Sequence, residues 1–481
     1  MPKDLRTFVS DLAEQMPADL VQVEQEIDPS KFEASALLQN LENAGKFPCV
    51  LWQRPRNLNG RYEGVQLISN VFATRKRMAL ALGLPPEKWR MDLSLEYSRR
   101  ENNHLQPVVV GKAEAPVKEI VRIGEEASLF DLPVVRGHRL DPAPFLNMQW
   151  VMKDPEGGFY NLSHHRAQMR EPRHSSIFVL QSAHNGAILE KYHRQGKPCP
   201  IVGILGHHPA FFLGGLTSGA FGVDEYTVIG GVLGEPLRLV ESETWGKDFL
   251  VPADAEIIVE GEIPPGVEEM EGPYGEFMSY YGGESMQAVL NVKAITYRSG
   301  PIMQYMFIGH ADAAVEYGVP LEGSLYNAVT ARIPRVTAVH LPLSGNCRFH
   351  IYAQIDKRID GEPVTAAWQL LTYTRFGKLA IMVDTDIDIY NERQVLWAVA
   401  SRVQADRQVH ICREMLAAGG QDPSSLHFSK STKMVIDATK PLDRPFAQVI
   451  DVPKEALEKC SLEKFLSQEA LERAPSLTDD E

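Results

Sequence analysis

Hydrophobic periodicity near the start of the chain predicts a helix, because apolar residues recur at intervals of three and four. These positions are Leu5, Phe8, Val9 and Leu12. Short apolar runs at 47–52 and 65–71 are typical of strands. Residues 74–81 predict a second helix, which the glycine and prolines directly after it terminate.

From residue 116 to about 300 the pattern changes to short β-rich runs separated by Gly and Pro. The runs are 148–152, 176–180, 201–205, 237–240, 256–260 and 288–297. Many short strands with turn residues between them are typical of a barrel or a sandwich-like domain. Beyond residue 320, helix and strand alternate again: 379–384 and 408–412 predict strands, and 392–402 predicts a helix.

The charged segment 455–472 is expected to be helical and to pack against a partner subunit. Together these patterns predict an α+β fold with a β-rich middle. The expected divisions are an N-terminal α/β region at 1–115, the β-rich domain at 116–300, a linker helix region at 301–330 and a C-terminal α/β domain at 331–481.

Composition excludes several classes of function. Lys and Arg number 49 and Asp and Glu 63, a net charge of −14, which disfavours binding to nucleic acid or to an anionic membrane surface. The five cysteines form no CxxC pair, so neither a disulfide framework nor a thiolate zinc site is indicated. The first residues do not read as a signal peptide, and no apolar run approaches the ~20 residues of a membrane span. We therefore expect a cytoplasmic protein.

The segment 270–276 carries two carboxylates, Glu271 and Glu276, separated by glycines and Pro273. A helix is forbidden there, so the backbone must turn, which can bring both carboxyls to one cavity. Paired carboxylates in a dry pocket have separated pKa values, and one of them can then act as a general acid near neutrality. The alternative is an acidic surface loop, because two further glutamates come directly before it.

The segment 161–166 follows the turn residues 154–158 and predicts the far strand of a hairpin. On such a strand Asn161, Ser163 and His165 face one way, and Leu162, His164 and Arg166 the other. Arg166 is suited to bind a carboxylate or phosphate. In the alternative reading the histidines pack and the arginine pairs with a surface acid.

Neither histidine pair, 164–165 or 207–208, has the spacing of a zinc helix motif. A hard cation held by Asn, His and Glu would be Mn²⁺ or Mg²⁺. The glycine-rich run 211–219 could let backbone approach a phosphate or a cofactor ring, or it could be a flexible turn.

Taken together, these motifs resemble the UbiD family of decarboxylases, which includes ferulic acid decarboxylase. The resemblance covers most of the chain. The motifs that support it, in chain order, are NLSHHR (161–166), QSAH (181–184), GILGHHPAFFLGG (203–215), DEY (224–226), VPADAEIIVEGEI (251–263), EGPYGE (271–276), VDTDID (383–388) and STKMVIDAT (431–439).

The resemblance implies a split-barrel-like middle domain that binds prenylated FMN, with Mn²⁺ (or Mg²⁺) and K⁺ beside the cofactor phosphate. It also implies that the C-terminal domain takes part in oligomerisation. The implied metal ligands are Asn161, His184 and Glu225. The implied cofactor-binding residues are these three with Ser163, His164, His165, Arg166, Gly215, Leu216, Thr217, Ser218 and the phosphate-binding Lys378, for which Arg375 is the competing candidate.

The resemblance further implies reversible, non-oxidative decarboxylation of an aromatic, heteroaromatic or α,β-unsaturated acid. Arg166 is expected to orient the carboxylate, Glu271 to donate the proton and Glu276 to hold Arg166. His164 and His165 stand where smaller or aliphatic residues are expected, and residues 408–411 would add polarity to the pocket. We therefore expect a polar aromatic or heteroaromatic acid.

The expected partners are this small-molecule acid, a flavin prenyltransferase that supplies the cofactor, and further copies of the chain in a homodimer or homohexamer. Two alternatives remain open at this point. One is a non-catalytic subunit of a larger carboxylase, and the other is a metal-dependent hydrolase.

Overall fold

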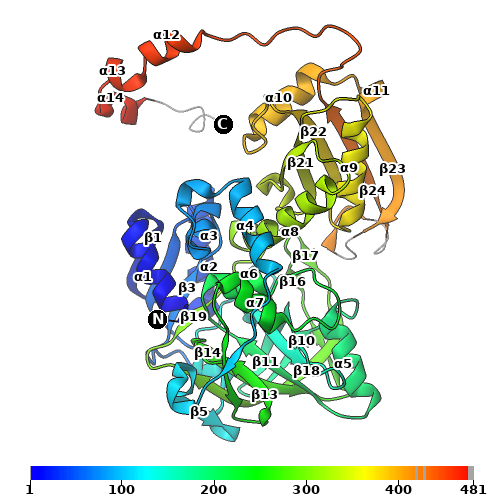
Figure 1. The fold of residues 1–481 in the computed structure, drawn as a ribbon. Helices are drawn as coiled ribbons and strands as arrows, with labels where there is room; N and C mark the ends of the chain where they lie inside the picture. The colour runs from blue at the N-terminus through cyan, green and yellow to red at the C-terminus, as the bar shows by residue number, and fades with distance from the viewer. Residues whose placement is uncertain (1, 418–420, 426–429, 475–481) are drawn as a thin grey trace. The chain divides into compact units, whose positions relative to one another are not determined.

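The computed structural model describes residues 2–417, 421–425 and 430–474 (Figure 1). The chain divides into one unit that ends at Thr439 and a second unit that begins at Lys440. In the part of the chain that the structure describes, no helix has the length and apolar character needed to cross a bilayer.

The N-terminal part of the first unit has a sheet of order β1-β2-β3-β19 and several helices. Its strands are β1 (Leu20–Ile27), β2 (Cys49–Pro55), β3 (Gln66–Ser69) and β19 (Ile302–Gln304), and its helices are α1 (Leu5–Gln15), α2 (Glu33–Asn43), α3 (Arg75–Ala81) and α4 (Met91–Glu101). The predicted first helix is confirmed: Asp4 accepts a hydrogen bond from the Thr7 N–H at 2.8 Å, and Leu5, Phe8 and Leu12 are buried. Because β19 pairs with β3, the chain returns to this sheet after the middle domain.

Within the described residues, the middle of the chain forms a sheet of ten strands. Its main path is β6-β9-β10-β18-β14-β11-β7-β8, and β5 and β15 also pair with β18. The strands are β5 (Ile120–Ile123), β6 (Phe145–Leu146), β7 (Gln149–Lys153), β8 (Tyr160–His164), β9 (Arg166–Glu171), β10 (His174–Phe178), β11 (Cys199–Ile204), β14 (Ile257–Ile263), β15 (Glu268–Glu271) and β18 (Ser285–Tyr297).

Helices and two small sheets accompany this large sheet. The helices are α5 (His184–Arg194), α6 (Pro209–Gly214) and α7 (Glu225–Leu233). One small sheet has the order β13-β12-β4, from Gly246–Pro252, Arg238–Ser242 and Val108–Val109, and the other pairs β16 (Tyr274–Gly275) with β17 (Tyr281–Gly282). The predicted β-rich middle is confirmed.

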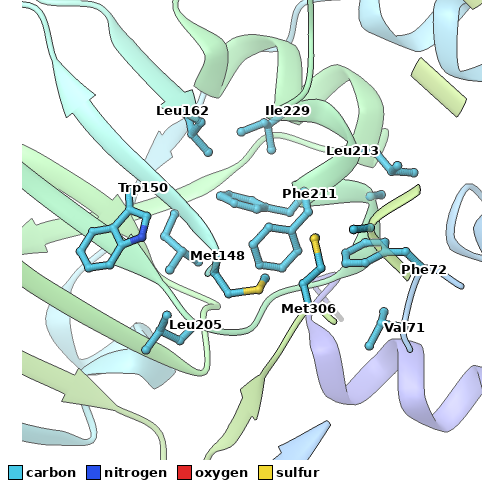
Figure 2. Close-up of a cluster of buried hydrophobic side chains, with 14 of the residues drawn as sticks. Val71, Phe72, Met148, Trp150, Leu162, Leu205, Phe211, Leu213, Ile229 and Met306 are labelled. Atoms are coloured by element: carbon cyan, nitrogen blue, oxygen red, sulfur yellow. The ribbon is translucent and has the colours of Figure 1, made fainter. Parts of the chain in front are cut away.

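A buried apolar cluster ties the middle sheet to the N-terminal part (Figure 2). Phe211 of α6 lies in the middle of the cluster, with Trp150 of β7 on one side and Phe72, from the connection before α3, on the other. Trp150 packs so closely over β11 that a Cβ at Gly203 would lie 2.8 Å from its ring. Phe72 meets Phe212 edge to face, with ring centroids 6.0 Å apart. This packing fixes strand β8, which carries the candidate site residues.

The C-terminal part of the first unit is a sheet of order β20-β21-β22-β24-β23, reached through the long helix α8 (Ala311–Thr330). Its strands are β20 (Val336–His340), β21 (His350–Ile355), β22 (Leu379–Asp384), β23 (Val409–Leu416) and β24 (Lys430–Ala438), and its helices are α9 (Glu362–Tyr373), α10 (Glu392–Arg402) and α11 (Ala405–Gln408). The predicted strands at 379–384 and 408–412 and the helix at 392–402 are confirmed.

The second unit contains three short helices in its described residues, α12 (Lys454–Lys459), α13 (Leu462–Phe465) and α14 (Gln468–Arg473). The helical character predicted for 455–472 is confirmed, in three short helices rather than one continuous helix. The chain leaves helical geometry at Cys460 and again at Leu466. Packing of this segment against a partner subunit stays a prediction, as do the domain boundaries.

Candidate functional site

The hairpin β7–β8 presents the first group of candidate residues. Asp154 closes its turn by accepting backbone N–H bonds from Glu156 at 2.9 Å and Gly157 at 2.6 Å. The strands then pair in antiparallel register, with Met152 opposite Asn161. The hairpin predicted from the sequence is confirmed.

The predicted alternation of side chains fails at the end of this hairpin. Strand β8 ends at His164, and β9 begins at Arg166. Because His165 lies between the strands, the two-residue period is interrupted there. His164, His165 and Arg166 consequently all line one cavity.

Arg166 is held between the two glutamates of the segment 270–276. Its Nε and Nη2 donate to Glu271 Oε1 and Oε2 at 2.8 Å and 3.2 Å, and its Nη1 donates to Glu276 Oε1 at 2.6 Å. Its guanidinium also lies over the rings of Phe178 and Tyr274, 4.4 Å and 4.6 Å from their centroids. Burial opposes the positive charge, but the carboxylates of Glu276 and Glu271 raise the pKa of Arg166 above its ordinary value.

The backbone turn that brings both carboxyls to Arg166 depends on a glycine. β15 ends at Glu271, and Gly272 follows with φ at +95°, a conformation that favours glycine. The chain then forms the two residues of β16 and reaches Glu276. The predicted turn is confirmed, and the acidic surface loop is excluded for Glu271, which is fully buried.

The cavity at Arg166 has a volume of about 110 Å³ and is lined mainly by aromatic and charged side chains. Its lining is Asn147, His164, His165, Arg166, Phe178, Tyr274, Glu276, Phe277, Ile308, Ala313, Tyr317, Arg348 and Gln421. Glu276 belongs to this wall, whereas Glu271 lies behind Arg166 and has no exposed surface. Residues 408–411 do not line the cavity, so the polarity expected from them is wrong.

The two histidines differ in their surroundings. His164 Nε2 lies 3.1 Å from Glu316 Oε2 and 3.3 Å from Gln149 Nε2. His165 is buried, its Nε2 contacts Asn185 Nδ2 at 2.9 Å, and burial lowers its pKa to about 3. His165 is therefore a neutral imidazole at physiological pH, and His164 is the histidine that has an anionic neighbour.

The three candidate metal ligands gather around the start of β8. His184, the first residue of α5, has Nδ1 3.1 Å from Asn161 Oδ1. Glu225, the first residue of α7, accepts a hydrogen bond from the Leu162 N–H. Burial lowers the pKa of His184 and raises that of Glu225. Among the described residues no group of three His, Cys, Asp or Glu side chains could hold a metal, so a site here depends on the amide oxygen of Asn161.

The glycine-rich loop reaches a second cavity. Thr217 and Ser218 line a cavity of about 440 Å³, and Thr217 donates to Glu101 Oε1 at 2.6 Å. Gln149 separates this loop from His164: its Oε1 is 2.2 Å from where a Cβ on Gly215 would stand. Gly215 is therefore required by this close approach. Leu216, which completes the expected loop, is half-buried.

The remaining candidate, Lys378, lies apart from these groups. It precedes β22, and its Nζ forms an ion pair with Asp422 at 2.9 Å and a hydrogen bond with Ser424 at 2.5 Å. Its competitor Arg375 lies over the ring of Phe376. Among the described residues, neither cation has a hydrogen bond or ion pair with Asn161, His184 or Glu225.

Several residues of the site were missed by the sequence analysis. Tyr274 and Phe178 pack on Arg166, Asn185 contacts both Asn161 and His165, and Arg348 lines the cavity. Tyr274 stands inside the segment 270–276, so its motif could have identified it. Arg348 comes from a turn before β21 with no motif around it.

Known proteins resemble the chain over nearly its whole length. Three family models match in order: the 3-octaprenyl-4-hydroxybenzoate carboxy-lyase N-terminal domain over residues 14–93, the Rift-related domain over 108–311 and the C-terminal domain over 317–438. A phenolic acid decarboxylase of Sedimentibacter hydroxybenzoicus is 29% identical over 457 residues, covering 92% of each protein.

Solved structures share the fold, among them two of the same enzyme. The UbiD-class enzyme HmfF from Pelotomaculum thermopropionicum in complex with FMN has a TM-score of 0.87 and 32% identity, covering 96% of this chain and all of its own. An evolved dimeric form of that enzyme in complex with prFMN has a TM-score of 0.84 and 31% identity, with the same coverage. The α+β fold class expected from the sequence is thus confirmed, and the chain belongs to the UbiD family of carboxy-lyases.

Proposed function

We propose that the protein catalyses the reversible, non-oxidative decarboxylation of an aromatic, heteroaromatic or α,β-unsaturated carboxylic acid with prenylated FMN. The observation that carries the proposal is the arginine Arg166, bonded to two carboxylates at the wall of a buried cavity. An arginine positions a carboxylate, and a carboxyl beside it can deliver a proton, which are the two tasks that this reaction requires.

The residues around β8 fit the cofactor and its metal. Amide oxygen, imidazole nitrogen and carboxylate oxygen from Asn161, His184 and Glu225 suit Mn²⁺ or Mg²⁺, which together with K⁺ would offset the charge of a flavin phosphate. Gln149 Oε1 and His165 Nδ1 are buried and have no hydrogen-bond partner among the described residues, as expected where a polar ligand is to be bound. FMN and prFMN are bound by the HmfF relatives.

The cofactor would be contacted by Ser163, His164, His165 and the loop from Gly215 to Ser218, with Lys378 as the candidate for its phosphate. When bound, prenylated FMN acts as the electron sink for loss of CO₂. The cavity of about 110 Å³ is below the roughly 300–1,000 Å³ of usual ligand pockets, so binding requires side chains around it to move.

The geometry favours a division of labour between the glutamates that is the reverse of the sequence-based expectation. Both oxygens of Glu271 accept hydrogen bonds from Arg166, so Glu271 is suited to hold the arginine. Glu276 faces the cavity, and among the described residues its Oε2 accepts no hydrogen bond. We therefore propose that Glu276 Oε2 carries the proton to the carbon that loses CO₂, while Arg166 orients the carboxylate.

No observation favours the two alternatives. A non-catalytic subunit has no need for the complete Arg166 network, and a hydrolase would need a metal-bound water beside the glutamates, whereas Asn161, His184 and Glu225 belong to a different cluster. Homodimer or homohexamer formation remains a prediction that light scattering after size-exclusion chromatography would test.

The experiment compares protein produced with and without a co-expressed flavin prenyltransferase. We expect CO₂ release from aromatic acids only with the prenyltransferase, and a flavin absorbance spectrum of the purified protein that differs between the two preparations. Equal activity from protein that holds a divalent metal alone would support a hydrolase and contradict the proposal.

A further inference from the structure

Arg348 is a second arginine in the cavity that contains Arg166. It lies two residues before β21, and only 6% of its surface is exposed. Arg348 and Arg166 line the same cavity but come from different domains of the family, because Arg166 lies in the matched Rift-related domain and the matched C-terminal domain begins at residue 317. The cavity thus has a guanidinium from each of two domains.

Its surroundings distinguish Arg348 from the other buried arginines. Arg77, Arg166 and Arg402 each form an ion pair with a carboxylate, at 2.9, 2.8 and 2.7 Å. Within the described residues Arg348 forms no such pair; the nearby acid Glu316 favours its charged form, but burial outweighs that effect and lowers the pKa of Arg348. A buried cation whose charge is only partly offset is costly in free energy, and an anionic ligand would reduce that cost.

Aromatic rings hold the Arg348 guanidinium. Its central carbon lies 4.0 Å from the ring centroid of Phe277 and 3.8 Å from that of Tyr317. Arginine stacked on rings in this way loses little conformational freedom when it binds a carboxylate through its N–H groups. The stack therefore presents a preoriented donor group to the cavity.

The positive charge of Arg166 is already offset by its two glutamates. Each nitrogen of that guanidinium already bonds a glutamate oxygen, and two carboxylates surround one positive charge. Glu316, the buried acid whose charge acts on Arg348, makes its direct ion pair with His164 instead, at 3.1 Å. Arg348 thus has no direct carboxylate partner among the described residues, and it can bind an anion in the cavity.

We propose that Arg348 is a specificity-determining residue that binds a second anionic group of the substrate, remote from the carboxylate that leaves. The inference rests on the proposed function and narrows it. The preferred substrates are single-ring aromatic or heteroaromatic acids with a second carboxylate. Arg166 orients the group that is lost, and Arg348 anchors the group that stays.

The test is calorimetric binding of benzoate, benzene-1,3-dicarboxylate and benzene-1,4-dicarboxylate to the holoenzyme at neutral pH. We expect one dicarboxylate to bind at least about tenfold more tightly than benzoate, the effect of one hydrogen-bonded charge pair. In Arg348→Gln that dicarboxylate should lose about 10- to 100-fold in affinity, while benzoate changes by less than about threefold.

Two further variants control for loss of structure. Arg348→Lys keeps the charge without the planar fork, so it should retain part of the preference if Arg348→Gln folds poorly. Arg402→Gln removes a buried arginine that pairs with Asp384 and does not line the cavity. This variant should keep the wild-type preference for the dicarboxylate over benzoate.

The outcomes separate this inference from the proposed function. A wild type without dicarboxylate preference, or equal losses for benzoate and dicarboxylate in Arg348→Gln, would overturn the role of Arg348 even if aromatic acids release CO₂. A preference that disappears in Arg348→Gln would uphold the binding role even if no acid is decarboxylated, because binding is measured without turnover.

Discussion

Glu271 accepts hydrogen bonds from two nitrogens of Arg166, at 2.8 Å and 3.2 Å, and its side chain is fully buried. The pair is thus a bidentate ion pair at the back of the cavity, with Arg166 between Glu271 and the solvent-accessible Glu276. Such a pair fixes the plane of the guanidinium.

Removal of Arg166 should destabilise the fold. Arg166→Met leaves Glu271 buried and without its partner, which costs about 3–5 kcal/mol in free energy of unfolding. Urea unfolding monitored by fluorescence measures the loss, and the double variant Arg166→Met, Glu271→Gln should recover much of it. A single variant as stable as the wild type would show that the pair does not contribute to stability.

Glu271→Gln should impair turnover without abolishing it. The amide keeps one acceptor for Arg166 but loses the second charge-assisted bond, so the guanidinium is less well oriented. We expect a loss of about 10- to 100-fold in kcat, by the cost of one charged hydrogen bond. Glu269→Gln, which alters an acid paired with His174 at the surface of β15, is the matched control. Complete loss of turnover in Glu271→Gln with cofactor still bound would restore the donor role to Glu271.

Metal binding should depend on the three residues around β8. His184→Ala and Glu225→Ala should each lose metal and cofactor together, as measured by elemental analysis and absorbance of the purified protein. His193→Ala, on the same helix α5 as His184, should retain both. Stoichiometric metal in the first two variants would refute the ligand set.

Acid should destabilise the protein through buried histidines. Burial lowers the pKa of His207 to about 3, below its ordinary value of 6.5, so between these values the unfolded chain binds more protons than the folded one. The stability from neutral His207 is complete above pH 6.5 and falls as pH decreases towards 3, by about 1.4 kcal/mol per pH unit. His207→Gln should flatten the dependence of unfolding free energy on pH by that amount. An unchanged slope would contradict it, and half-buried His193→Gln is the control.

Much of the fold was predictable from local sequence. Helix α10 and strand β22 have the predicted ends, because apolar periodicity and caps such as Asn391, which accepts a hydrogen bond from Gln394 N–H, act within a few residues. The helical character of 455–472 was predictable too, but its breaks at Cys460 and Leu466 were not, because a charged helical pattern does not show where a chain with little packing of its own leaves helical geometry.

Site residues were predictable only where they belong to a sequence motif. Arg166, Glu271 and Glu276 stand in recognisable segments, and the structure brings them together. The cavity position of His165 follows from where β8 ends, which strand alternation cannot reveal. Arg348 reaches the cavity through tertiary packing against Phe277 and Tyr317, and no local pattern reports that contact.

Glu276 is proposed to deliver the proton in a decarboxylation whose substrate carboxylate is oriented by Arg166. The most direct measurement is deuterium incorporation in D₂O at the carbon that loses CO₂, with holoenzyme and Glu276→Gln loaded with equal cofactor. We predict one deuterium per product from the wild type, and a rate lower by about 10²- to 10⁴-fold in the variant, the range for loss of a general acid. A variant that labels product at the wild-type rate would contradict this role of Glu276.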